Sequence, residues 1–400
     1  PTLPPGMPAK RFGQHAVKPR HLTRLSFPSE LTAPRHSDCM LPVVLASQDG
    51  RHRMLNIGII GCGCHARWAI IPAMLNSGCC KLSAMADPDP ASMDEVKAPG
   101  IHKYRHASDM FAKERLDAVC IATPVEAHRD MTVLALKAGC HVCCEKPMAV
   151  NKRECRLMID AALKADRILA IDFESRFYPG YQQVQRWIAE GHLGQVRAVH
   201  VDSMWDGHKA TGPLSARRKG FLDRSGCLDC GVHKLDIIRF ICGGGQWQDV
   251  RAIGAWFDED VRFPPHIGVQ GRLDTGAMVT LNESFAFGAY MKQRPAYVNV
   301  AVVGTRGVVV LENVKDQPPV FRLTSDSLNA TAPLDETDHA VTIVYLLQEL
   351  DAAIHGGPGP FHFARGEDGL AAQVALDAAN RDAVKGCCGK RMAHRAKRRG

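Results

Sequence analysis

The sequence contains no apolar run that approaches the about 20 residues needed to span a bilayer. Its nearest match to a signal-peptide core, at 41–46, is too short and lies too far from the first residue. Internal repeats are also missing. We therefore expect no membrane partner. The absence of an export signal, together with 15 cysteines, favours the reducing cytoplasm.

A continuous basic region is missing as well, although the formal net charge is +8. Residues 1–53 carry +5 and residues 386–400 carry +6, so the part between them carries −3. This distribution indicates solvated basic ends rather than a nucleic-acid groove. A chain of 400 residues exceeds one typical core, so two domains are expected. The predicted divisions are a disordered or non-native extension at 1–53, domains at 54–172 and 173–385, and a basic tail at 386–400.

The cysteines do not follow a metal-binding pattern. Cys140 and Cys143 lie on a predicted strand, where residues three apart point to opposite faces. Cys227 and Cys230 could share one face of a helix. Most other cysteines stand where small apolar residues are usual, as buried free thiols do. No metal ion is expected.

Between residues 55 and 173, short apolar runs alternate with helical segments. Strands are expected at 55–60, 81–86, 117–122, 140–145 and 168–173, and helices end near 76, 138 and 165. Gly139 suits a helix C-terminus and Asn151 a helix N-terminus. This alternation indicates a parallel, doubly wound α/β sheet with right-handed crossovers.

The pattern changes after residue 173, where hairpin-spaced strands indicate a mainly antiparallel sheet. Strands are expected at 196–203, 250–256, 268–273, 278–283, 298–303 and 308–312, and helices at 180–190, 228–242, 339–354 and 367–384. The turn 304–307 separates two of these strands. The second domain is therefore expected to be α+β.

A glycine-rich loop follows the first predicted strand and opens a helix. Gly61 and Gly63, with Ala66 in the third position, allow a tight turn and the close approach of a pyrophosphate. The helix amides would then hold that group. Cys64 and His65 lie on the same loop and are included among the candidate cofactor contacts.

Asp87 ends the second predicted strand, at the position where a carboxylate takes the ribose 2′-hydroxyl of a dinucleotide. The same carboxylate would repel a 2′-phosphate, and no Arg follows it directly. NAD is therefore favoured over NADP. The alternative is that Asp87 only forms a turn before Pro88.

Two further strand ends carry candidate cofactor contacts, because ligands collect at the carboxyl ends of such strands. Thr123-Pro124, with His128, is expected beside the nicotinamide ribose; the alternative is a plain strand-to-helix turn. Glu145-Lys146 ends the next strand, which places a Lys within reach of the nicotinamide.

A second cluster, Asp229-x-Gly231-x-His233, has helical spacing. Oxidising an alcohol needs a base for the hydroxyl proton and a group that stabilises the oxyanion, while hydride leaves for the nicotinamide. His233 fits the base, Lys146 the electrostatic partner, and Asp229 the carboxylate that supports the imidazole. A helix-capping Asp with a surface His is the alternative.

Arg176 opens the second domain in the segment Arg176-Phe177-Tyr178-Pro179. An Arg at this junction could contact the substrate or brace the two domains. Both roles stay open, and Arg176 is included among the candidate cofactor-site residues.

Taken in order, these segments resemble the glucose-fructose oxidoreductase, inositol dehydrogenase and rhizopine catabolism (Gfo/Idh/MocA) family. The resemblance extends over about 54–386 and includes Gly191-His192-Leu193-Gly194-Gln195-Val196 and Asp368-Gly369-Leu370. It implies a Rossmann domain, a second domain with a large open sheet, and a final helix that packs on the first domain. It also implies a homodimer or homotetramer joined through the sheets, with Lys146, Asp229 and His233 at the reacting carbon.

The chain departs from the family pattern before Asp229. Of the glycine run that is frequent there, only Gly226 is present. The segment 206–224 is expected to face the substrate, and it contains the basic residues Arg217, Arg218 and Lys219. The resemblance implies an NAD-dependent oxidoreductase that acts on a sugar, polyol or cyclitol.

Two other functions are open on the same fold. One is a non-catalytic NAD-binding regulator, although the presence of all three candidate catalytic residues argues against it. The other is a glycosidase in which NAD oxidises the sugar transiently.

Overall fold

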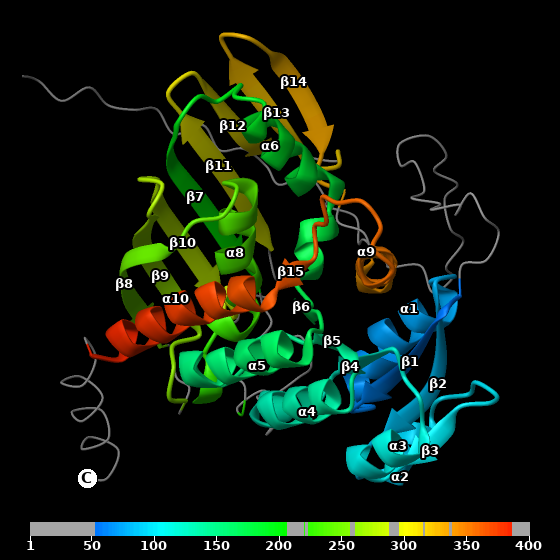
Figure 1. The fold of residues 1–400 in the computed structure, drawn as a ribbon. Helices are drawn as coiled ribbons and strands as arrows, with labels where there is room; N and C mark the ends of the chain where they lie inside the picture. The colour runs from blue at the N-terminus through cyan, green and yellow to red at the C-terminus, as the bar shows by residue number, and fades with distance from the viewer. Residues whose placement is uncertain are drawn as a thin grey trace, which may run out of the picture. The chain divides into compact units, whose positions relative to one another are not determined.

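The computed structural model describes residues 53–205, 220, 223–256, 261–287, 296–314, 317–335 and 338–385. Two sheets, named sheet A and sheet B, organise this part of the chain (Figure 1). The predictions for the two ends of the chain, and for Arg217, Arg218 and Lys219, lie outside the described residues. Within those ranges, none of the helices combines the length and apolar character that crossing a bilayer requires.

Sheet A contains the expected doubly wound strands. Their order is β15-β6-β5-β4-β1-β2-β3, and all pairs are parallel except β15 with β6. The strands are β1 (Leu55–Ile60), β2 (Cys80–Ala86), β3 (His102–Tyr104), β4 (Ala118–Ile121), β5 (His141–Cys144), β6 (Leu169–Ile171) and β15 (Ala364–Arg365). The strands after β1 are added on one side of it as β2 and β3 and on its other side as β4, β5 and β6, and ligands bind beyond the carboxyl ends of the strands at such a switch point.

The three helices predicted around sheet A are present, and two short helices, α2 and α3, were not predicted. The helices are η1 (Ala66–Ile70), α1 (Ile71–Asn76), α2 (Pro90–Asp94), α3 (Ala107–Lys113), α4 (Val125–Lys137) and α5 (Lys152–Ala165). The Asn151 side chain accepts hydrogen bonds from the amides of Arg153 and Glu154, both at 3.0 Å, which caps α5 as expected. Gly139 follows α4 with a φ of 85°, the left-handed conformation that favours glycine.

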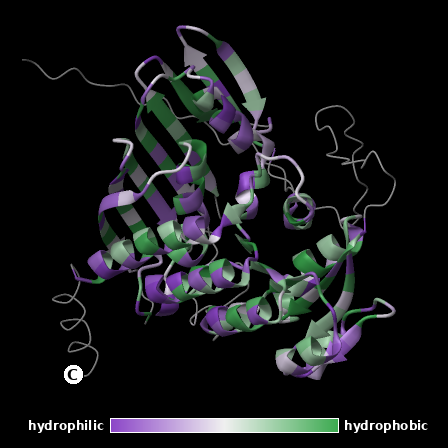
Figure 2. Cartoon of the chain, viewed as in Figure 1, coloured by the Kyte–Doolittle hydropathy of each residue, from purple (hydrophilic) through white to green (hydrophobic). Residues whose placement is uncertain are grey.

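Sheet B is mainly antiparallel, as predicted. Its order is β14-β13-β12-β11-β7-β10-β9-β8, and only β7 and β10 are parallel. The strands are β7 (Val196–Met204), β8 (Trp247–Ala255), β9 (His266–Leu273), β10 (Met278–Ser284), β11 (Tyr297–Gly304), β12 (Gly307–Glu312), β13 (Val320–Ser325) and β14 (Asn329–Pro333). Polar and apolar residues alternate along these strands, so one face of the sheet is buried (Figure 2).

Helices of the second half of the chain connect the two sheets. They are η2 (Glu174–Phe177), α6 (Pro179–Ala189), α8 (Leu228–Ile241), α9 (His339–Ile354) and α10 (Gly366–Lys385). Helix α10 contacts α8 and β8 and also packs on α5. The amide of Lys152 at the start of α5 donates to Asp377 of α10 at 3.3 Å. The final helix therefore packs on the first domain.

Candidate active site

A pocket of about 630 Å³ opens at the carboxyl ends of β1, β2 and β4. The glycine loop forms one wall. Gly61 has a φ of +91°, and a Cβ there would lie 2.7 Å from the backbone of Ala122 and Thr123, so this turn requires glycine. A Cβ at Gly63 would meet nothing within 4 Å. The loop thus leaves open space before the start of the first helix, as a pyrophosphate needs.

Asp87 lines the same pocket. One carboxylate oxygen accepts from the Cys62 amide at 2.7 Å, and the other accepts from the Asp89 amide at 2.9 Å. The side chain therefore fixes both the glycine loop and its own turn. Arg105, which the sequence interpretation missed, also lines the pocket, and it donates to the Pro88 carbonyl at 3.3 Å. Arg105 follows β3, and no motif in the sequence around it marks it as a residue of the pocket.

Thr123 and Pro124 line the pocket, and His128 lies behind them. The buried His128 ring contacts two carbonyl oxygens: that of Thr123 at Nε2, 2.9 Å away, and that of Pro147 at Nδ1, 3.0 Å away. Burial lowers the pKa of His128. His128 thus joins the loops after β4 and β5 and positions the residues that face the pocket.

His65 turns from the glycine loop toward Glu145. Its Nε2 lies 2.8 Å from a Glu145 carboxylate oxygen. Burial disfavours a charged ring, but the hydrogen bond and charge of Glu145 outweigh it and raise the pKa of His65. Cys64, the neighbouring candidate, is exposed. The contact joins the loop after β1 to the loop after β5.

Asp172 completes a buried acidic pair with Glu145. The ligand atoms of His65, Glu145 and Asp172 lie within 4.8 Å of one another, a spacing that could hold a metal ion. Burial, and then the negative charge of Glu145, raise the pKa of Asp172 well above its usual range. A protonated Asp172 that donates to Glu145 accounts for the short spacing without a cation.

Lys146 reaches from the loop after β5 to the first turn of α8. Its Nζ donates to the backbone carbonyl of Asp229 at 3.3 Å and lies 3.9 Å from Cys230 Sγ. Burial opposes the charge of Lys146, but Cys230, Asp229 and Glu145 outweigh it and raise the pKa above its usual value. The ammonium therefore stays charged at the site. Lys146 thus contacts the first turn of the helix that carries Asp229 and His233.

His233 is buried one turn further along α8. Burial, and then the positive charge of Lys146, lower its pKa well below the usual value, so the imidazole is neutral. Its Nδ1 lies 3.4 Å from Oε2 of Glu174, and the Phe173 ring packs edge-on at 5.7 Å. The sequence interpretation gave the supporting role to Asp229. The structure also places the Glu174 carboxylate beside the imidazole.

Glu174 is the main residue that the sequence interpretation missed. It lies three residues after the end of β6 and opens η2, so it is close to a strand end, where ligands collect, although it does not follow the strand directly as Glu145 follows β5. Its Oε1 lies 3.3 Å from Nδ1 of His339, the first residue of α9. Burial raises the pKa of Glu174 to about 7.

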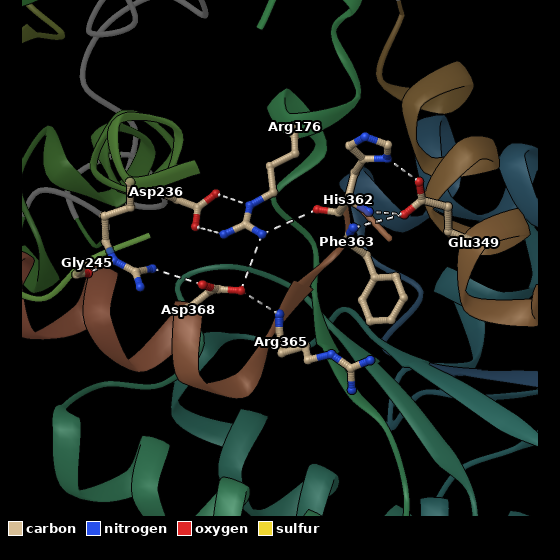
Figure 3. A network of polar contacts seen from close by, with 9 residues as sticks. Arg176, Asp236, Gly245, Glu349, His362, Phe363, Arg365 and Asp368 are labelled. Carbon is tan, nitrogen blue, oxygen red and sulfur yellow. Dashed lines mark hydrogen bonds and ion pairs between the residues drawn. The ribbon is translucent and has the colours of Figure 1, made fainter. Parts of the chain in front are cut away.

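Arg176 is absent from the pocket lining. Its guanidinium donates to both carboxylate oxygens of Asp236, at 2.7 and 2.6 Å, and to the carbonyl oxygen of His362 at 3.3 Å (Figure 3). It also pairs with Asp368 at 3.3 Å, and Arg239 pairs with the other oxygen of Asp368 at 3.0 Å. The contact of Arg176 with the cofactor stays a prediction, and the partners that the structure gives it favour the bracing role. The network braces η2, α8 and α10 against one another.

Comparison with known proteins identifies relatives of both halves of the chain. Residues 55–173 match the family model described as "Oxidoreductase family, NAD-binding Rossmann fold". Residues 181–310 match the model described as "GFO/IDH/MocA C-terminal domain".

Individual relatives extend over most of the chain. Myo-inositol 2-dehydrogenase of Thermotoga maritima is 27% identical over 248 residues, 60% of this chain and 70% of that protein. Inositol 2-dehydrogenase of Rhizobium meliloti is 25% identical over 346 residues, 83% of this chain and 97% of that protein. A solved levoglucosan dehydrogenase, in complex with NADH and levoglucosan, has a TM-score of 0.69 at 21% identity and covers 83% of this chain and 98% of that chain. This last similarity shows the fold.

Proposed function

Because the chain belongs to the Gfo/Idh/MocA family of oxidoreductases and is an NAD(P)-dependent dehydrogenase, we propose that it oxidises a hydroxyl carbon of a sugar, polyol or cyclitol. The observation that carries the proposal is the contact between Lys146 and the first turn of α8. This contact brings a charged ammonium and the neutral imidazole of His233 to the sheet edge where a nicotinamide would lie.

The glycine loop fits a dinucleotide, because it combines the obligatory turn at Gly61 with open space at Gly63. We propose that this loop, Asp87 and Thr123-Pro124 hold the cofactor. When bound, NAD supplies the acceptor for the hydride that leaves the substrate carbon. The Asp87 carboxylate supports NAD as the preferred cofactor, because it would repel a 2′-phosphate.

Four protein side chains are assigned to the remaining steps, which are proton removal and stabilisation of charge. His233 takes the hydroxyl proton at Nε2, since Nδ1 faces Glu174. Lys146 stabilises the negative charge that develops on the substrate oxygen. Asp229 contributes to holding the Lys146 ammonium charged. Glu174 fixes the orientation of the His233 ring.

The substrate class rests on the relatives, which include dehydrogenases named for inositol, D-glucoside and levoglucosan. A screen of cyclitols, glycosides and free sugars, with NAD and with NADP, tests the proposal by NADH or NADPH absorbance. Steady accumulation of reduced cofactor is expected with at least one compound. Hydrolysis of a glycoside without such accumulation would favour the glycosidase, and no turnover with any compound would favour the regulator.

The exposed face of sheet B supports a homo-oligomer as a further part of the proposal. By strand register, Ile253, Met278, Val303 and Val310 lie on the same face, and Ile253 is 83% exposed. Apolar residues gathered on one exposed sheet face are typical of a subunit interface. We propose that two copies pair through this face.

The domain boundaries and the cellular compartment stay proposals. The division at 172–173 agrees with the end of the first family model at residue 173. The described cysteines are all free and most are buried, which supports the cytoplasm as the compartment.

A further inference from the structure

Three titratable side chains form a line from the buried His233 to the protein surface. Glu174 stands in the middle, with Oε2 at 3.4 Å from Nδ1 of His233 and Oε1 at 3.3 Å from Nδ1 of His339. The three residues come from α8, η2 and α9. The side chains of Glu174 and His233 are 8% and 11% exposed, whereas the His339 side chain is 42% exposed.

We propose that Glu174 and His339 conduct to solvent the proton that His233 removes from the substrate. This inference rests on the proposed function, because it requires His233 to be the base. Glu174 and His339 then act through His233, as positioning and proton-transfer residues rather than as groups that touch the substrate.

The surroundings of His233 explain why the proton that it accepts needs a path to solvent. Each oxidation sends a hydride to the cofactor and leaves one proton on the protein. The imidazolium form of His233 is disfavoured by burial and by the positive charges of Lys146 and Lys234. The ring is therefore a poor place to store a proton, and the proton must leave before the next turnover.

The proposed proton transfers lead from the substrate hydroxyl through the three side chains to water. At the start we assign one proton to Nδ1 of His233, one to Oε1 of Glu174 and one to Nε2 of His339. The substrate O–H bond breaks and its proton bonds to Nε2 of His233, while the Nδ1 proton passes to Oε2 of Glu174. The Oε1 proton then passes to Nδ1 of His339, whose Nε2 proton goes to water.

This sequence releases one proton and leaves the number of protons on the three residues unchanged. The electron pair of the C–H bond leaves with the hydride, so none of the three residues is oxidised or reduced. Before the next turnover each group must return its proton to the starting atom, by rotation of the side chain or by exchange with water.

The charges around the line suit such transfers. The charged and titratable groups that face it, from all the elements packed against it, are Lys146, Lys234, Glu145, Asp172, His65 and Asp338. Burial raises the pKa of Glu174 to about 7, and burial lowers the pKa of His339. A carboxyl group with a pKa near neutrality can both hold and release a proton, as the middle group of a relay must. The Trp68 ring packs edge-on against His339 at 5.2 Å and holds its orientation.

The test compares proton release with NADH formation in rapid-mixing experiments on the full chain. The substrate is the compound with the fastest turnover in the screen, the solution is weakly buffered, and a pH-indicator dye reports protons. In the parent protein both signals should rise together. In His339→Gln and Glu174→Gln proton release should lag behind NADH, by roughly tenfold or more. Added imidazole should remove the lag in His339→Gln, whose site is exposed, but not in Glu174→Gln.

The matched control is His355→Gln, because His355 stands at the other end of α9 and pairs with Asp351. Its two signals should stay together. If proton release keeps pace with NADH formation in both His339→Gln and Glu174→Gln, the inference is wrong. The proposed function fails separately, if His233→Ala keeps its turnover.

A second measurement needs no substrate. Nitrogen-15 NMR of histidine-labelled protein should show His233 protonated at Nδ1, with that preference weakened in Glu174→Gln. A His233 ring that is protonated at Nε2 in the parent protein would contradict the proton assignment.

Discussion

At the scale of single residues, the candidate site depends on two side chains whose charge states are set by their neighbours. Lys146 is buried but stays charged, because Cys230 and the carboxylates around it raise its pKa. His233 is buried close to that charge and stays neutral. One group can therefore stabilise an oxyanion while the other accepts its proton, which is the division of roles that alcohol oxidation needs.

Replacement of either residue should stop the reaction without releasing the cofactor. We expect Lys146→Ala to lower kcat by about a hundredfold or more and His233→Ala by about 100- to 10,000-fold. NAD affinity, measured by fluorescence titration, should change little in both. The pH–rate profile of the parent should fall only in acid, because His233 loses its base form as the pH drops through a pKa that lies well below the usual value.

His233→Ala should lack that acid limb. Lys137→Ala is a suitable control, because this Lys lies at the C-terminal end of α4, outside the site. Normal turnover of His233→Ala with an unchanged pH profile would place the base elsewhere.

Cofactor choice depends on the balance between Asp87 and Arg105 in one pocket. We expect tighter binding of NAD than of NADP, because the Asp87 carboxylate repels a 2′-phosphate. Asp87→Ser should narrow the difference, and Arg105→Ala should widen it, because a cation in the pocket attracts the phosphate. Fluorescence titrations of both cofactors measure the two ratios. Tighter NADP binding by the parent protein would contradict the assignment of Asp87.

The brace around Arg176 should contribute to stability rather than to catalysis. Arg176→Ala leaves Asp236 buried without its bidentate partner, and breaking such a pair typically costs about 3–5 kcal/mol. Thermal unfolding should show a clearly lower Tm. The matched control is Arg322→Ala, which removes an exposed pair with Glu312 and should leave Tm nearly unchanged. Equal Tm values for both variants would show that the network is not a brace.

Sequence reasoning found those site residues that follow a local rule. Lys146 ends a strand and His233 has helical spacing from Asp229, and the structure brings the two clusters together. It could not find His339, whose role depends on a contact with Glu174 across a long stretch of chain. It also did not consider Glu174 as a partner of His233, because spacing along a helix is visible in a sequence and contact between elements is not.

At the scale of elements, the two glycines of the loop are expected to serve different purposes. Gly61 is required by the fold, and Gly63 leaves space for the cofactor. Gly61→Ala forces a side chain into backbone atoms at a left-handed φ, and strain of this kind costs roughly 1–3 kcal/mol before the clash is counted. Gly63→Ala meets open space. We expect Gly61→Ala to lower Tm, and Gly63→Ala to keep Tm but weaken NAD binding. Thermal unfolding and fluorescence titration provide the two measurements, and a lowered Tm in Gly63→Ala would contradict this division.

The elements that were predicted correctly are long and strongly patterned. Helix α9 has the predicted bounds, and the five predicted strands of sheet A differ by at most two residues at their ends. The short strands β3 and β15 of sheet A were not predicted, and in sheet B neither were β13 and β14. The sequences of β13 and β14, VFRLTS and NATAP, are short and half polar, and they form strands because β12 offers an edge for pairing. Sheet pairing of this kind is not encoded locally.

At the scale of the whole molecule, assembly should depend on the exposed face of sheet B. Ile253→Glu places a charge on this face and should shift the protein to smaller species in light scattering after gel filtration. Leu163→Glu is the matched control, because Leu163 is 72% exposed on α5 and belongs to the first domain. An unchanged mass for Ile253→Glu would show that the face does not join subunits.

Strand β15 has a consequence for the order in which the protein is made. Residues Ala364 and Arg365 pair with β6, so sheet A receives its last described strand from a late part of the chain. A ribosome that has finished residues 54–172 has therefore not yet made this strand of sheet A. Until residue 365 emerges, the edge of β6 is open, and an open edge can pair with another chain. The domain that is synthesised first is thus among the last parts of the protein to be completed.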